Sequence, residues 1–69
     1  MALTEITSID TYRIRRIGGD RKLRRHLEEL GFIPGERIKV ISRVASGLIV
    51  NIKGSRIAVN NDVAAMVFV

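Results

Sequence analysis

The 69-residue sequence contains no cysteine and no tryptophan, a single histidine, a single proline, one tyrosine and two phenylalanines. Without cysteine the chain can form neither a disulfide nor a thiolate metal site, which fits a reducing compartment. No apolar run approaches the ~20 residues that span a bilayer, and no basic stretch followed by an apolar block marks a secretory signal. We therefore expect one small folded domain, residues 1–69, in the cytoplasm, with no insertion into the membrane.

The residues that catalysis or metal binding would need are also scarce. His26 has no serine or cysteine nucleophile near it in the sequence. A metal site with Glu28 or Glu29 is one interpretation, but a histidine on a helix surface is favoured. Gly18-Gly19-Asp20 could hold a phosphate at a helix N-terminus, yet it lacks phosphate-loop spacing and is favoured as a turn. We expect no enzyme activity, no cofactor and no metal.

The stretch from Leu27 to Gly35 organises the rest of the chain. Leu27 and Leu30 lie three residues apart, on one face of a helix. Gly31 follows the last periodic leucine and is predicted to end the helix in a left-handed conformation. Pro34 and Gly35 suit the second and third positions of a tight turn. The sequence therefore predicts helix before this joint and strand after it.

The predicted helix covers residues 21–30, with Asp20 as its N-cap. Its apolar stripe contains Leu23 together with Leu27 and Leu30. On the polar face, Arg24–Glu28 and Arg25–Glu29 are spaced for weak ion pairs. Arg21 and Lys22 oppose the helix dipole in the first turn.

Alternating apolar and polar residues predict five strands, at 11–17, 36–44, 48–53, 57–59 and 65–69, with a helical turn through Ala64. We predict a mostly β fold, in which a small antiparallel barrel closes its own edges and the helix flanks one end. Leu3, Ile6 and Ile9 of the lead-in are expected at the edge of the core. The predicted core consists of Tyr12, Ile14, Ile17, Leu23, Leu27, Leu30, Phe32, Ile38, Val40, Leu48, Val50, Ile52, Ile57, Val59, Ala64, Val67 and Val69.

The net charge is +5, and the basic residues are unevenly distributed. A concentrated basic surface attracts an anionic partner, although a charge run can also serve only to keep a small domain soluble. A basic β-barrel that binds nucleic acid is the alternative function, but no aromatic residue for base stacking stands within the cluster. Seven of the twelve basic residues lie in one segment: Arg13, Arg15, Arg16, Arg21, Lys22, Arg24 and Arg25.

The last strand suggests a second type of surface. If Val67 and Val69 point inward, Met66 and Phe68 point outward, and the same alternation places Ile41 and Ile49 outside. Together they would form an apolar patch for a partner or for self-association. The alternative is that Phe68 folds over an open end of the barrel.

The assembled pattern resembles the FeoA family, the small cytoplasmic proteins of bacterial ferrous iron uptake. The resemblance runs from Tyr12 to Val69 and is most specific at the joint and its approach. The residues that carry it are Ile17-Gly18-Gly19-Asp20, Leu27, Leu30-Gly31-Phe32-Ile33-Pro34-Gly35, Ile38, Val40, Ile52-Lys53-Gly54, Arg56, Ala58-Val59, Ala64, Val67 and Val69.

This resemblance implies an SH3-like barrel with an inserted helix, and as a partner the cytoplasmic G-protein domain of the membrane iron transporter FeoB. Family members are thought to support or regulate that transporter. Many have a proline-containing loop between the two long strands, where this chain has only Ala45-Ser46-Gly47-Leu48. A similar domain ends some metal-dependent transcription regulators, but this chain has no DNA-binding helix pair. The expected docking residues are Arg13, Arg15, Arg21, Lys22, Arg24, Arg25, Met66 and Phe68, and no nucleic-acid partner is expected.

Overall fold

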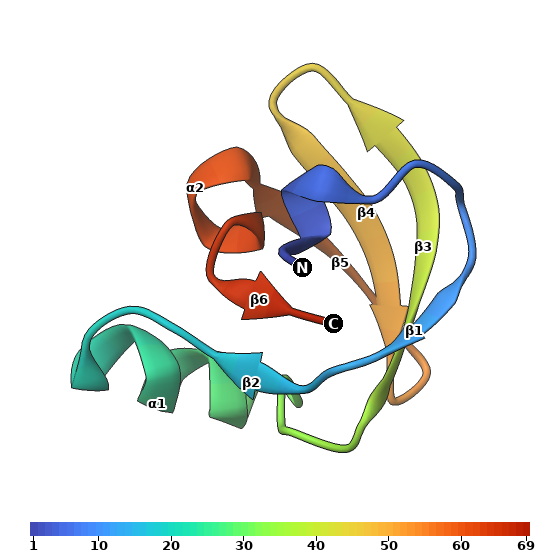
Figure 1. The fold of residues 1–69 in the computed structure, drawn as a ribbon. Helices are drawn as coiled ribbons and strands as arrows, with labels where there is room; N and C mark the ends of the chain where they lie inside the picture. The colour runs from blue at the N-terminus through green and yellow to red at the C-terminus, as the bar shows by residue number, and fades with distance from the viewer.

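Two antiparallel sheets form the framework of the protein, and the computed structural model describes all of residues 1–69 (Figure 1). The larger sheet has the strand order β1-β3-β4-β5, and the smaller one pairs β2 with β6. The strands are β1 (Thr11–Arg13), β2 (Arg16–Ile17), β3 (Arg37–Val44), β4 (Gly47–Ile52), β5 (Ser55–Asn60) and β6 (Val67–Phe68).

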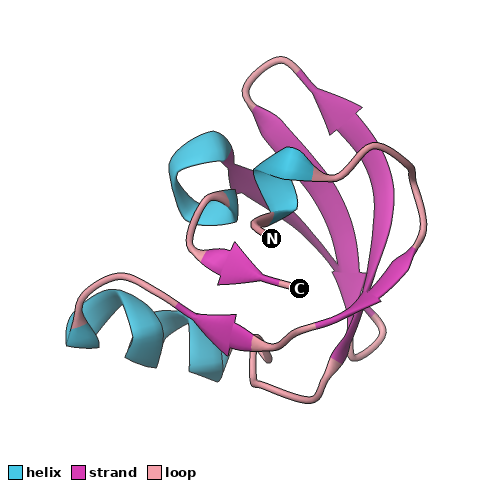
Figure 2. Cartoon of the chain, in the orientation of Figure 1, coloured by secondary structure: helices cyan, strands magenta, loops and turns pink.

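Three short helices complete the fold: the 3-10 helix η1 (Leu3–Glu5), α1 (Arg21–Glu29) and α2 (Asn61–Ala64). Figure 2 shows that α1 projects at one end of the molecule, beside the smaller sheet, while η1 and α2 lie on the inner side of the larger sheet. None of these helices has the length and apolar character needed to cross a membrane. The predicted mostly β architecture with one inserted helix is confirmed.

The predicted closed barrel is wrong, because the first strand is divided between the two sheets. The Ile14 N–H donates to the Glu36 carbonyl at 2.9 Å, which continues the pairing with β3. The next N–H, that of Arg15, donates to the Phe68 carbonyl at 2.7 Å. The chain thus leaves one sheet and joins the other within two residues, and the predicted strand 11–17 becomes β1 and β2.

Both ends of α1 follow from the local sequence. The Asp20 carboxylate accepts from the Leu23 N–H at 2.8 Å, as a side-chain N-cap does. At the other end, the Phe32 N–H donates to the Leu27 carbonyl at 2.9 Å and the Gly31 N–H to the Glu28 carbonyl at 3.0 Å. This pair of bonds is the Schellman motif, and Gly31 adopts the required positive φ, +105°. The predicted helix end is confirmed.

The chain turns again immediately after this helix end. Gly35 has φ +94°, and the Glu36 N–H donates to the Ile33 carbonyl at 3.0 Å, so residues 33–36 form a type II turn with Pro34 at its second position. The Gly35 N–H also donates to the Ile14 carbonyl at 2.8 Å. The turn is thereby fastened to the point where β1 gives way to β2, which places Pro34 near β2.

Most of the predicted core residues are buried or partly buried. The prediction for Leu30 is wrong, because 40% of its surface is exposed. Leu30 is the C-cap of α1, and after the left-handed Gly31 it is Phe32, fully buried, that enters the core. In the lead-in, Leu3 and Ile6 are core residues, whereas Ile9 is 62% exposed. The Arg43 guanidinium donates to the Ile6 carbonyl at 2.6 Å, which fixes the backbone at Ile6 beside the core.

The two termini lie side by side. The Val69 N–H donates to the Met1 carbonyl at 2.8 Å, and the terminal ammonium of Met1 donates to the Val69 carbonyl at 3.0 Å. A further antiparallel bridge joins Ala2 to Phe68. The first residues of the chain therefore cover the edge of β6 that faces away from β2.

Candidate functional site

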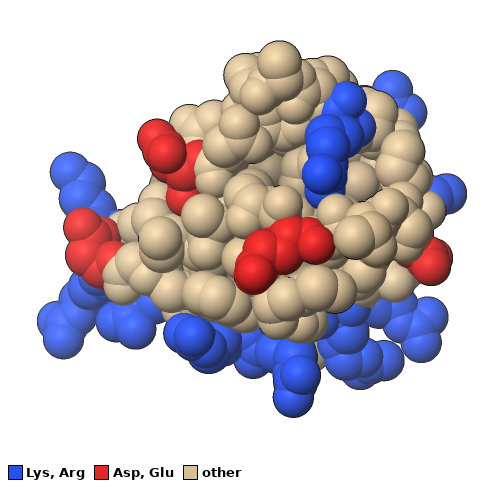
Figure 3. All heavy atoms as spheres, turned by 45° about the horizontal axis from the view of Figure 1, so that its top comes forward, with Lys and Arg blue, Asp and Glu red and all other residues tan.

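Basic side chains gather along one edge of the molecule. Figure 3 shows lysines and arginines crowding its lower edge, along the end where α1 lies, while much of the upper face carries no charge. All seven residues of the predicted basic cluster are exposed. Arg13 belongs to β1, Arg15 and Arg16 lie at β2, and the other four, Arg21, Lys22, Arg24 and Arg25, project from α1.

The helix carboxylates do not neutralise this surface. The predicted pairs Arg24–Glu28 and Arg25–Glu29 are not formed, and the only ion pair in the protein joins Lys53 to Glu36 at 3.7 Å. A pair on an exposed helix gains only ~0.3–0.5 kcal/mol, which is little against the entropy of fixing two long side chains. None of the seven basic groups is therefore neutralised by an ion pair within the protein.

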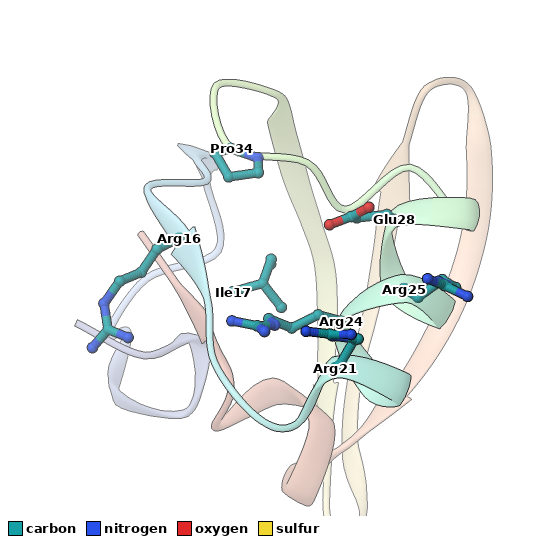
Figure 4. Close-up of a pocket in the computed structure, with 7 residues that line it drawn as sticks. All are labelled: Arg16, Ile17, Arg21, Arg24, Arg25, Glu28 and Pro34. Carbon is teal, nitrogen blue, oxygen red and sulfur yellow. The ribbon is translucent and has the colours of Figure 1, made fainter.

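Four of these arginines line a groove of about 480 Å³ between β2 and α1. Ile17, a partly buried residue that packs against the core, contributes an apolar surface to the groove, and Pro34 lies at one end (Figure 4). Glu28 is the one acidic residue in the lining. The lining arginines are Arg16, Arg21, Arg24 and Arg25.

The four arginines differ in direction. Figure 4 shows Arg21 and Arg24 reaching from α1 into the space beside Ile17, whereas Arg25 points to the outer side of the helix and Arg16 points away from the groove. The groove thus has two guanidinium groups toward the start of α1, an apolar middle and a carboxylate toward its end. Such an arrangement can accept an elongated anionic ligand that has an apolar part.

Arg16 instead interacts with the last strand. Its guanidinium lies over the Phe68 ring, 4.0 Å from the centroid, as a cation–π contact. Met66 lies close by, since both its sulfur and the Phe68 ring approach the backbone of Gly18. Phe68 and Met66 are partly buried, so neither is a freely exposed apolar side chain.

The single apolar patch predicted from strand alternation is not formed. Met66 and Phe68 belong to β6 and its approach, whereas Ile41 and Ile49 lie in β3 and β4 of the other sheet. Ile41 falls at a register shift between Val40 and Ser42, and it is partly buried. The register shift interrupts the predicted alternation in β3, and the division into two sheets separates these strands from β6.

His26 lies exposed on α1, as its favoured interpretation predicted. No cluster of three or more histidine, cysteine, aspartate or glutamate side chains is positioned to hold a metal ion. At the start of α1 the Asp20 carboxylate already occupies the Leu23 N–H. The Gly18-Gly19-Asp20 segment therefore acts as a turn and a helix cap.

The structure brings together only some of the predicted docking residues. Arg21, Arg24 and Arg25 share the groove, whereas Arg13 and Lys22 lie outside it, and Arg15 flanks Phe68 beside β6. Arg16 was placed in the basic cluster but not among the docking residues, and the groove residues Ile17, Pro34 and Glu28 were not predicted as site residues. No local pattern could have indicated them, because the contact between β2 and α1 is created by the tertiary fold.

Comparison with known proteins gives the family. The family model of the FeoA domain matches residues 1–69, and a search of curated protein sequences finds no match. A crystal structure of an iron uptake regulatory protein, FeoA, is 28% identical, with 97% of this chain and 91% of that chain covered at a TM-score of 0.85.

Two further structures show how widely the fold occurs. The solution structure of FeoA from Chlorobium tepidum is 23% identical, with 97% of this chain and 66% of that chain covered at a TM-score of 0.84. ScaR with bound Cd²⁺ is 18% identical, with 99% of this chain but only 33% of that chain covered at a TM-score of 0.91. At these identities the likeness shows the fold alone. On the match of the family model over its whole length, the chain belongs to the FeoA family.

Proposed function

We propose that this protein is a non-enzymatic accessory component of bacterial ferrous iron uptake, which acts in the cytoplasm by docking on the G-protein domain of a FeoB-like transporter. Membership of the FeoA family implies an accessory role in ferrous iron transport. The 28% identical structure is described as an iron uptake regulatory protein. The same fold also forms part of ScaR, so the support for iron uptake comes from the family and not from the fold.

The observation that carries the docking proposal is the uncompensated basic surface on α1 and β2. Its arginines are exposed and have no carboxylate within ion-pair distance. A surface of this kind accelerates encounter with an acidic partner and fixes its orientation. Arg21, Lys22, Arg24 and Arg25 therefore form the centre of the proposed docking surface, with Arg13, Arg15, Met66 and Phe68 at its margin.

A calorimetric titration with the cytoplasmic domain of FeoB tests this proposal. It is run with and without a GTP analogue, and an RNA oligomer serves as a parallel ligand. Saturable binding to the G-protein domain alone is the expected result. Binding to RNA alone, with an affinity that falls steeply with salt, would replace the docking proposal with the nucleic-acid alternative.

Charge reversal then locates the surface. The triple variant Arg21→Glu/Lys22→Glu/Arg25→Glu should weaken binding at least about tenfold, because it inverts the charge on one side of the complex. The matched control, Lys39→Glu/Lys53→Glu/Arg56→Glu, changes the net charge equally at exposed positions outside the surface. Equal affinities for the two variants would exclude the basic surface as the docking site.

A further inference from the structure

β2 has a hydrogen-bonding edge that no strand occupies. On one side it pairs with β6, and the Arg15→Phe68 and Gly18→Met66 backbone bonds, both 2.7 Å, flank this pairing. On the other side the neighbour is the groove, with α1 as its far wall (Figures 1 and 4). An open strand edge is a template for an added extended chain, which binds through its main chain.

The far wall of the groove carries the charge that would select such a chain. Arg21 and Arg24 extend into the groove from consecutive turns of α1, and no carboxylate lies within 4.0 Å of either guanidinium. The guanidinium group matches a carboxylate in bidentate geometry. The groove therefore selects a chain whose acidic side chains lie on the face that is turned toward Arg21 and Arg24.

The spacing of the two arginines also fits an extended chain. Residues three apart on a helix have Cβ atoms roughly 5–6 Å apart. Alternate side chains of an extended chain lie on the same side, roughly 6.6–6.8 Å apart. Two acidic residues separated by one residue can therefore meet Arg21 and Arg24 together.

The groove also offers apolar contacts. Ile17 and Pro34 both line it, so an apolar side chain beside the acidic residues would find an apolar contact surface. A flat lipid surface, by contrast, would reach the rims of a groove but not Ile17 between its walls. The concave shape favours a peptide over a membrane.

We propose that the groove between β2 and α1 binds an extended peptide segment in which acidic residues alternate with apolar ones. The segment adds a strand to the open edge of β2, and its carboxylates bind Arg21 and Arg24. This inference deepens the proposed function and rests on it for the source of the segment, which is a FeoB-like transporter. The chemistry of the groove can be tested without that partner.

The first probe is a short synthetic peptide that alternates glutamate with valine, titrated against the whole 69-residue protein. Binding is followed by calorimetry and by backbone amide chemical shifts. We expect shifts to concentrate at Arg16, Ile17 and the groove face of α1. The same peptide with glutamine in place of glutamate should bind at least about tenfold more weakly, since the charge-assisted bonds are lost.

The decisive variant is Arg21→Glu/Arg24→Glu, and its control is Arg37→Glu/Lys39→Glu, which changes the net charge equally at exposed positions of β3. The groove variant should lose roughly ten- to hundredfold in peptide affinity while the control retains it. Circular dichroism verifies that both are folded, and Arg21→Gln/Arg24→Gln repeats the test without added negative charge. Equal losses in groove and control variants would overturn the proposal, because they indicate unselective attraction.

Backbone pairing has its own test. Two peptides are methylated at alternate backbone nitrogens, one in each register, and the one whose methyl groups face β2 cannot pair with it and should bind at least about tenfold more weakly than the unmethylated peptide. Unchanged affinity for both would overturn strand addition. Binding to vesicles of anionic phospholipid, together with no binding of the acidic peptide, would overturn the proposal in favour of a membrane surface.

The same two variants separate this inference from the proposed function. If the FeoB cytoplasmic domain binds the groove variant as tightly as the unchanged protein, docking stands and the groove inference fails. If the peptide binds in the groove but the FeoB domain does not bind at all, the groove is an acidic-peptide site whose partner is another protein. Loss of both ligands in the groove variant alone supports both proposals.

Discussion

The guanidinium carbon of Arg16 lies 4.0 Å from the centroid of the Phe68 ring, and the same two residues are register partners in the β2–β6 sheet. Arg16 and Phe68 therefore join the first and last thirds of the chain both through their backbones and through their side chains. Their contact also withdraws Arg16 from the groove and leaves Arg21 and Arg24 as the arginines that extend into it.

A double-mutant cycle should detect this contact. Arg16→Gln removes the cation and Phe68→Leu removes the aromatic face, and their coupling free energy should be about 0.5–1 kcal/mol, as for cation–π pairs at exposed sites. Urea unfolding of the four proteins measures it. Strictly additive losses would show that Phe68 acts only by its apolar area.

Gly31→Ala should destabilise the protein by roughly 1–2 kcal/mol, because φ is +105° at a position where an L side chain is strained. The added Cβ would lie 3.4 Å from the flexible Lys53 side chain and 3.9 Å from the Ile52 side chain, both ordinary contact distances, so conformation and not crowding causes the loss. D-alanine at the same position, introduced by chemical synthesis, is the control. Thermal unfolding should show loss with the L residue and none with the D residue.

Asp20→Ala should lower the free energy of unfolding by about 1 kcal/mol through loss of the cap on the Leu23 N–H. Asp20→Asn keeps an oxygen acceptor and should retain most of that stability. Amide hydrogen exchange in the first turn of α1 measures the effect locally. If Asp20→Asn lowers the free energy of unfolding as much as Asp20→Ala does, then the negative charge beside the basic helix, and not the hydrogen bond, stabilises α1.

The N-terminal segment should be essential to the core. Leu3→Ala should cost about 2–5 kcal/mol, since the side chain is fully buried in the core cluster. Ile9→Ala, at a 62% exposed position of the same segment, should change stability by less than about 0.5 kcal/mol. Urea denaturation compares the two. Similar small effects at both positions would mean that the segment is only loosely attached.

The elements that sequence alone predicted are those set by neighbouring residues. The end of α1 at Gly31, the turn at Pro34 and the cap at Asp20 each depend on contacts within six residues, and each is confirmed. Leu30 was misplaced because the apolar stripe was extended to the last leucine. The left-handed Gly31 instead sends Phe32 into the core.

The features that escaped prediction depend on residues far apart in the chain. The division into two sheets requires Arg15 to pair with Phe68, which no local pattern encodes. The arginines were recognised as a cluster because they lie close together in the sequence. The groove arises only where β2 and α1 meet, with Ile17 and Pro34 between them.

The pairing of the two ends has a practical consequence for engineering. Because Met1 and Val69 exchange backbone hydrogen bonds, a short linker could close the polypeptide into a ring without disturbing either sheet. New termini could then be opened in the hairpin at Lys53 and Gly54, both of which are exposed. A circular permutant of this kind would carry a fluorescent label at its new termini and leave Arg21 and Arg24 untouched.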